Sequence, residues 1–278
     1  MRRNGTINQQ MTSVRNIDPI INVFEKKKKI KRVKMIGWKK IIVTNLFFSY
    51  QNKKDFYNLK NINLEIKKGE KIAFVGENGS GKSTMLMIIK SLYHSKGEIY
   101  LDEIKLKDYF KGISYKIALI PQEAELFKNT IKHNITLGVK YRKEHIEKLV
   151  KITNFDKTLE KFPEKYEKNI GEKGSNLSGG EKQKLALTRG LLASKEKEII
   201  LLDEPTSKID PKNELEIYKN ILEEFKEKTI ISTVHRLHLL KLFDKIVFFE
   251  KGKIVAAGNL EEVLKNENFY EMWKKNSF

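Results

Sequence analysis

The chain has 278 residues and no cysteine, which excludes disulfide bridges, thiolate metal sites and cysteine nucleophiles. Its 55 Lys and Arg residues outnumber 36 Asp and Glu residues. The lysines are spread along the whole chain and form no single basic stripe, so we expect no nucleic acid partner. No apolar run approaches the roughly 18–20 residues of a membrane-spanning helix, and no signal peptide is expected.

Residues 1–36 predict a helical arm followed by a basic linker. Apolar residues recur at steps of three and four between Ile7 and Phe24, which is helix periodicity, and Pro19 either kinks this helix or begins a second one. The arm can simply pack on its own domain. The run of Lys and Arg between residues 26 and 34 either faces anionic lipid headgroups or is a solvated linker, and a nuclear signal is the least favoured reading.

Residues 37–278 predict one α/β domain with a mixed sheet. Residues 41–66 suggest an antiparallel edge, and apolar runs suggest buried parallel strands at 71–75, 116–120, 198–203 and 229–233. Residues 123–189 predict an inserted helical subdomain. Residues 247–255 predict a hairpin that turns at Lys251-Gly252, and a helical tail carrying Phe269, Tyr270 and Trp273 should pack on the core.

A glycine-rich loop joins the strand at 71–75 to a helix that begins near Met85. Such a loop points successive N–H groups at phosphate oxygens, and the helix adds its positive end. Lys82 should reach the outer phosphates and Ser83 should hold Mg²⁺. A plain glycine turn is the alternative, but the whole string favours phosphate binding. The loop comprises Gly76, Glu77, Asn78, Gly79, Ser80, Gly81, Lys82, Ser83 and Thr84.

Polar residues follow three of the predicted core strands. Asp203 and Glu204 end the apolar run at 198–202, where Asp203 can hold the Mg²⁺ shell and Glu204 can orient an attacking water. Gln122 follows Ile120-Pro121 and can contact both the metal and that water. His235 follows the run at 230–234 and can reach Glu204 and the outer phosphate. Without the neighbouring motifs, Gln122 would be interpreted as an ordinary surface residue and His235 as an ordinary core residue.

A second glycine-rich element, Asn176-Leu177-Ser178-Gly179-Gly180-Glu181-Lys182-Gln183, precedes a helix predicted for 181–192. Ser178 and Glu181 also have the spacing of a capping box, and capping is compatible with phosphate binding because both use the same helix end. This order of motifs resembles the nucleotide-binding domain of an ATP-binding cassette (ABC) transporter, from about Ile41 to the C-terminus. Two further segments, 122–135 and 170–174, resemble the exporter branch of that family.

The resemblance implies an ATP- and Mg²⁺-dependent ATPase, an α/β phosphate-loop core with an inserted helical subdomain, whose sites are shared between two subunits. Ser178, Gly179 and Gly180 would face the nucleotide of a partner in a homo- or heterodimer. Tyr50 would stack on adenine. Asp210 would lie in a loop that crosses the dimer interface, and Glu172 and Gln122 would sense the membrane part. Glu181 departs from the family, whose commonest signature has Gln there.

The resemblance further implies that the domain powers a membrane exporter from the cytoplasmic face, as a peripheral subunit. The membrane-spanning part would be a separate chain or a missing segment, and the arm at 1–36 would then continue its last helix. The alternative function is a soluble ABC-type ATPase that acts on nucleic acid or ribosomes. Such proteins usually carry tandem cassettes or a long coiled-coil insertion, and this sequence has neither.

Overall fold

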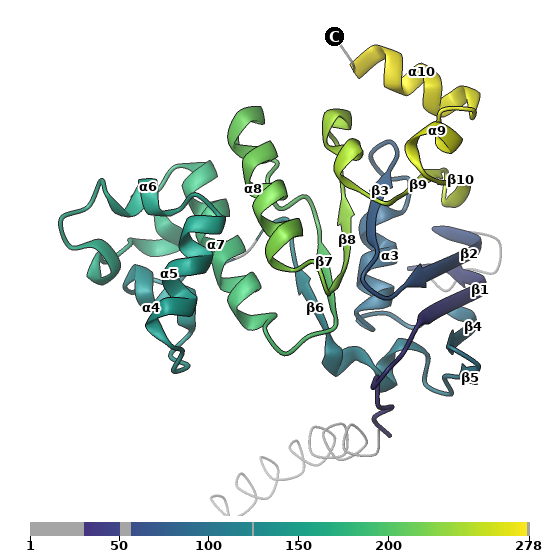
Figure 1. Cartoon of the computed structure of the whole chain (residues 1–278), viewed down its shortest axis with the longest axis horizontal. Coiled ribbons are helices and arrows are strands. Elements are labelled where there is room, and N and C mark those ends of the chain that lie inside the picture. Colours follow the sequence, from purple (N-terminus) through teal and green to yellow (C-terminus); the bar gives the residue numbers. More distant parts are fainter. Residues whose placement is uncertain (1–30, 51–56, 124, 277–278) are drawn as a thin grey trace, which may run out of the picture.

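The computed structural model describes residues 31–50, 57–123 and 125–276. The helical arm predicted for the N-terminus and most of the basic linker lie outside these ranges. Two sheets and a group of helices make up the described part, and the helices α4 to α7 project from one side of it (Figure 1). Within the described residues, no helix has the length and apolarity needed to span a membrane.

The larger sheet has six strands in the order β10-β9-β3-β8-β7-β6. Its middle strands are apolar and buried on both faces, as expected for parallel strands covered by helices. Five strands run parallel and only β10 is antiparallel. The strands are β3 (Lys71–Val75), β6 (Ile117–Ile120), β7 (Ile199–Leu202), β8 (Thr229–Thr233), β9 (Lys245–Glu250) and β10 (Lys253–Gly258).

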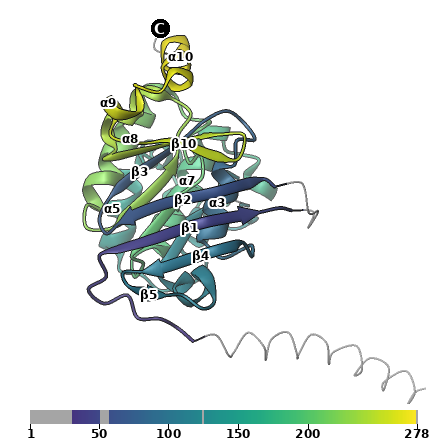
Figure 2. The same cartoon turned by 90° about the vertical axis from the view of Figure 1, so that its right-hand side faces the viewer.

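The smaller sheet is antiparallel, with the order β2-β1-β4-β5, and Figure 2 shows its strands side by side. The fold class is confirmed, but the antiparallel edge predicted from residues 41–66 is a separate sheet. The β9–β10 hairpin takes the antiparallel edge instead. In β1, buried residues alternate mostly with half-buried ones, because one of its faces is better covered than the other. The strands are β1 (Lys40–Phe48), β2 (Leu59–Lys67), β4 (Lys96–Leu101) and β5 (Ile104–Lys105).

Helix α3 (Lys82–Ile89) packs between the two sheets. Its side chains Met85, Leu86 and Ile89 are fully buried in one apolar cluster together with residues of β1, β2 and β3. Since α3 begins in the phosphate loop, this packing fixes the loop against both sheets. Two short 3₁₀ turns, Tyr109–Gly112 and Ser114–Lys116, lead from the smaller sheet into β6.

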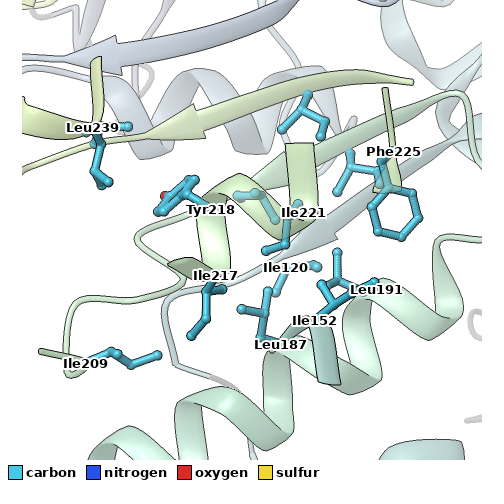
Figure 3. Close-up of a cluster of buried hydrophobic side chains, with 14 of the residues drawn as sticks. Ile120, Ile152, Leu187, Leu191, Ile209, Ile217, Tyr218, Ile221, Phe225 and Leu239 are labelled. Atoms are coloured by element: carbon cyan, nitrogen blue, oxygen red, sulfur yellow. The ribbon is translucent and has the colours of Figure 1, made fainter. Parts of the chain in front are cut away.

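The helical part follows β6 and returns to the larger sheet through α7. A second apolar cluster joins it to the sheet: Leu187 and Leu191 of α7 lie with Ile120 of β6 and Ile221 of α8 (Figure 3). The helices are α4 (Ile131–Thr136), α5 (Lys143–Ile152), α6 (Asp156–Leu159), α7 (Gly179–Ala193) and α8 (Pro211–Glu224), with 3₁₀ turns at Lys165–Glu167, Glu172–Gly174 and Leu237–Leu242.

The C-terminal segment forms α9 (Leu260–Val263) and α10 (Glu267–Asn276) beside the hairpin. The hairpin predicted at 247–255 is present, and Lys251 and Gly252 take positive φ angles of 46° and 80° in its turn. The helical tail is also present. Phe269 is buried against Phe248, with ring centroids 5.4 Å apart, whereas Tyr270 is 44% exposed. The tail therefore packs on the core through one face only.

Candidate functional site

The phosphate loop needs glycine at two positions where the chain passes close to its neighbours. Gly76 has φ 144°, and a Cβ there would lie 2.1 Å from the carbonyl oxygen of Phe249. Gly81 has φ 110° and a Cβ would meet Leu59 at 2.5 Å. Gly81 is also the N-cap of α3, and among the described residues no side chain caps this helix and no acid stands in its first turn. The free N–H groups and the helix dipole suit an anion.

Lys82 lies folded over this loop. Its Nζ donates hydrogen bonds to the carbonyl oxygens of Gly76 (2.8 Å) and Glu77 (2.9 Å), and the residue is only 5% exposed. Burial lowers the pKa of Lys82, while the carboxylates of Glu204 and Asp203 act in the opposite direction. A buried ammonium with two carbonyl partners is a strong point charge for an incoming phosphate.

Ser83, Asp203 and Thr233 form a chain of hydroxyl–carboxylate contacts at the ends of α3, β7 and β8. The Ser83 hydroxyl donates to Asp203 Oδ1 at 2.8 Å, and the Thr233 hydroxyl donates to the same oxygen at 3.0 Å. Burial raises the pKa of Asp203, and these two hydrogen bonds oppose the rise. A hydroxyl and a carboxylate are hard oxygen donors, so this pair fits Mg²⁺, which in phosphate-binding sites keeps one or two protein ligands.

Glu204 is held in place by hydrogen bonds to both its carboxylate oxygens and its backbone N–H. It takes a positive φ of 44°, and its backbone N–H donates to the Thr233 hydroxyl at 2.8 Å. Gln122 Nε2 donates to one carboxylate oxygen at 2.6 Å, and His235 Nε2 lies 2.5 Å from the other. Since an ionised carboxylate only accepts, the His235 nitrogen that faces it carries the proton. The structure thus brings all three residues together from the ends of three adjacent strands.

The phosphate loop borders a cleft of about 570 Å³. Its other walls come from His235, the turn at Glu250 and Lys251, and α10. No described residue of the second glycine-rich element, 176–183, lines this cleft. Among the described residues, only the first of the two glycine-rich elements therefore contributes to this cleft.

The second glycine-rich element begins α7 with both hydrogen bonds of a capping box. The Ser178 hydroxyl accepts from the Glu181 N–H at 3.3 Å, and Glu181 Oε2 accepts from the Ser178 N–H at 2.8 Å. Lys161 Nζ lies 2.7 Å from the other Glu181 oxygen. Burial opposes ionisation of Glu181, but the bonds from Lys161 and Ser178 prevail and lower its pKa. The predicted helix is present, and Glu181 is ionised and paired.

Comparison with known proteins identifies the family. The sequence model described as "ABC transporter" matches residues 59–207, more than half of the chain. The chain belongs to the ABC transporter family. An export ATP-binding/permease protein of Rickettsia bellii is 36% identical over 229 residues, which are 81% of this chain and 39% of that protein. ABC transporter B family member 21 of Arabidopsis thaliana is 35% identical over 81% of this chain and 18% of its own length.

A solved structure is similar as well. The structure of a bacterial Atm1-family ABC exporter with ATP bound matches with a TM-score of 0.80 and 26% identity, covering 90% of this chain and 44% of that chain. The resemblance inferred from the motifs is therefore confirmed. The chain spans less than half the length of these relatives, so it corresponds to one part of each.

Three contributors to this ABC site were not predicted. The Thr233 hydroxyl holds the Asp203 carboxylate and the backbone N–H of Glu204, just after β7. Gln183 is 7% exposed and donates to the Ser207 hydroxyl (2.9 Å) and the Glu204 carbonyl (3.3 Å), while its own oxygen accepts from the Lys208 N–H (2.8 Å). This amide ties the start of α7 to the turn after Glu204. Two features of the sequence could have pointed to these residues. Thr233 is a polar residue at the end of a β-branched strand, and Gln183 follows Gly180 by three residues.

A third network lies behind His235. Glu214 of α8 is 4% exposed and accepts from the Thr206 hydroxyl at 2.6 Å and from Arg236 at 2.8 Å. Arg236 also donates to the Ile209 carbonyl at 2.8 Å. A buried carboxylate with two partners rigidifies the backbone next to His235. Neither Arg236 nor Glu214 belongs to a periodic pattern in the sequence, so their contact could not be predicted from it.

The remaining predicted residues lie at the edges of the site. Tyr50 is 50% exposed, and its hydroxyl lies 3.0 Å from the Thr84 hydroxyl, at the start of α3. Asn78 and Gly79 are exposed on the phosphate loop, and Ser80 is buried beneath it. Asp210 caps α8, accepting from the Asn213 N–H at 3.1 Å, and the Asn213 side chain lowers its pKa. Its predicted position at a dimer interface stays a prediction.

Proposed function

We propose that this chain is the ATP-hydrolysing domain of a membrane exporter and that it works as a head-to-tail dimer of such domains. The observation that supports this most is the position of Glu204 between Gln122 and His235, beside the Ser83–Asp203 pair. A phosphate loop, a metal-compatible oxygen pair and a held carboxylate are the parts that nucleotide hydrolysis requires.

In this proposal the phosphate tail binds first. The uncapped N–H groups of α3 receive the phosphate oxygens, and Lys82 exchanges its two carbonyl partners for the outer phosphates. Ser83 and Asp203 would hold Mg²⁺, and Gln122 is a further ligand candidate. When bound, Mg²⁺ neutralises charge on the outer phosphates. Tyr50, beside Thr84, offers its ring to adenine.

Glu204 then orients and polarises the attacking water. Gln122 and His235 each occupy one of its carboxylate oxygens, so the carboxylate is held in one rotamer before the reaction. Such preorganisation lowers the cost of aligning the water with the outer phosphate. Once the nucleotide is bound, the single N–H of a neutral His235 would be shared between Glu204 and that phosphate, since its exposed ring borders the same cleft.

The second half of each site would come from a partner. Ser178, Gly179 and Gly180 start α7 away from the cleft that borders the phosphate loop, so they are available to the nucleotide of another subunit. Two copies facing head to tail make an isologous dimer with two such sites. All the motif residues are present in this chain, so both sites of a homodimer should hydrolyse; a heterodimer would use the same surfaces.

The exporter role rests on the relatives, which are named as export ATP-binding/permease proteins. We propose 37–278 as the ATPase domain, with the helical subdomain at about 123–189, attached at the cytoplasmic face to a membrane-spanning part. The segment 1–36 would connect or contact that part, with its basic residues near lipid headgroups. The relatives give no support to the alternative role on nucleic acid or ribosomes.

The test is the dependence of ATP hydrolysis on protein concentration. A site shared by two chains predicts a specific activity that rises with concentration and then saturates, because monomers bind ATP without hydrolysing it. We expect no stimulation by added RNA. A specific activity that is constant from nanomolar to micromolar protein would contradict the shared site.

A further inference from the structure

An aromatic cluster next to the phosphate loop has no assigned role beyond Tyr50. Tyr93 is 39% exposed and lies after α3, where Ser91 turns the chain with a positive φ of 65°. Its ring centroid is 5.2 Å from that of Tyr50 at 87°, and 5.3 Å from that of Phe48. Phe48 also meets Tyr50 edge to face, at 4.8 Å and 83°. Edge-to-face packing is the favoured geometry for such pairs.

The other contacts of Tyr50 fix its position relative to the loop. Its backbone N–H donates to Asn58 Oδ1 at 3.0 Å, and its hydroxyl lies 3.0 Å from the Thr84 hydroxyl. These bonds hold the backbone and the hydroxyl of Tyr50. They do not fix the plane of its ring, and the neighbouring aromatic rings restrict that rotation. With half of its surface still exposed, Tyr50 presents part of its ring to solvent.

We infer that Tyr93 is a positioning residue for the nucleotide base: it holds the Tyr50 ring in the orientation that stacks on adenine. Tyr93 lies four residues beyond the helix that begins with Lys82, so the turn after α3 links the base contact to the phosphate contacts. Two hydrogen bonds close that helix, from the Ser91 N–H to Ile88 (2.8 Å) and from the Leu92 N–H to Met87 (2.9 Å). Without Tyr93, the Tyr50 ring would become ordered only when the nucleotide binds, and this ordering would cost binding free energy.

The inference rests on the proposed function, because it assumes that Tyr50 stacks on the base. The experiment compares two ligands in calorimetry: Mg-ADP, which has the base, and Mg-pyrophosphate, which lacks it. Neither is hydrolysed by this reaction. For Tyr93→Ala we expect the Kd of ADP to rise about three- to tenfold, the range for one unordered side chain, while the Kd of pyrophosphate stays unchanged. Tyr93→Phe should keep the wild-type Kd for ADP.

Two controls separate positioning from general damage. Leu92→Ala changes the exposed neighbour of Tyr93 and should leave both dissociation constants unaltered. Tyr50→Ala should weaken ADP selectively, and adding Tyr93→Ala to it should cause no further loss, because Tyr93 acts only through Tyr50. An equal loss of both ligands in Tyr93→Ala, or no loss of either, would overturn the role of Tyr93 without contradicting the phosphate site of the wild-type chain. If Tyr50→Ala itself binds ADP normally, the base contact in the proposed function fails too.

Discussion

Helices α3 and α7 both begin at glycine-rich elements, yet their N-termini differ in capping and in the charges beside them. The N-terminus of α3 is uncapped by any described side chain, has no acid in its first turn and carries the buried Lys82. The N-terminus of α7 is closed by Ser178 and Glu181, with Lys161 against the carboxylate. An open helix end binds an anion by itself, whereas a capped end has already satisfied part of its N–H groups. Under the proposed function, α3 would bind nucleotide in a monomer and α7 would contribute only in a dimer.

The largest effect expected is on turnover in Glu204→Gln, because Glu204 would lie between the two helix ends in the proposed dimer. Hydrolysis should fall about 10²–10⁴-fold, the usual contribution of a positioned acid–base group, while ATP still binds through α3. The trapped nucleotide should then hold α3 of one chain against α7 of the other, seen as a dimer in gel filtration with Mg-ATP. Glu196→Gln, at the opposite end of β7, is the matched control and should hydrolyse normally. A monomer with full activity would refute the assignment.

The open end of α3 is tested by Lys82→Met. Removing the ammonium should weaken ATP binding by roughly 100-fold, because charge-assisted hydrogen bonds to phosphate are lost. Lys90→Met is the control: this lysine ends the same helix and donates to the Ser114 and Ile117 carbonyls at 3.0 and 2.7 Å. It should lower the melting temperature without changing the affinity for ATP. Unchanged affinity in Lys82→Met by calorimetry would contradict the phosphate site.

The capped end of α7 is tested by Ser178→Arg. Monomeric ATP binding should survive, but dimerisation and hydrolysis should fall together by at least about tenfold, because a bulky cation would occupy the place of the partner's outer phosphate. Mixing this variant with Lys82→Ala should restore one shared site. Ser178→Ala removes the capping hydroxyl without adding bulk or charge and should cost about 1 kcal/mol of stability. Normal turnover in Ser178→Arg would favour a self-contained ATPase.

The smallest effect concerns the charge at α7. Lys161→Met should leave Glu181 as an unpaired carboxylate beside the helix end and weaken the ATP-dependent dimer about two- to fivefold, as expected for a single ion pair. Glu181→Gln should relieve this, so the double variant should match Glu181→Gln alone. Analytical ultracentrifugation in the Glu204→Gln background measures the dimer. A loss in the double variant equal to that in Lys161→Met would show that the ion pair is not the cause.

The sequence predicted the phosphate loop, helix α7 and the polar residues at the strand ends, because each depends on residues that are close together in the chain. Glycine spacing forces the loop, apolar runs form buried strands, and parallel strands bring their C-terminal ends to one edge. Gln122, Glu204 and His235 could therefore be assigned to one site before their distances were known. The contact between His235 and Glu204 was also predicted, whereas the hydrogen bond from Gln122 to Glu204 was not.

Tertiary structure decided what depends on packing between distant segments. The separation of β1 and β2 into their own sheet follows from the β9–β10 hairpin, which pairs with β3 and leaves no edge there. The contacts of Thr233, Gln183 and Glu214 join residues far apart in the sequence, and no periodicity marks them. The sequence by itself determined which chemical groups are present and which strand ends carry them. Folding alone determined which of these groups touch, because hydrogen bonds form only where close packing brings donor and acceptor within about 3 Å.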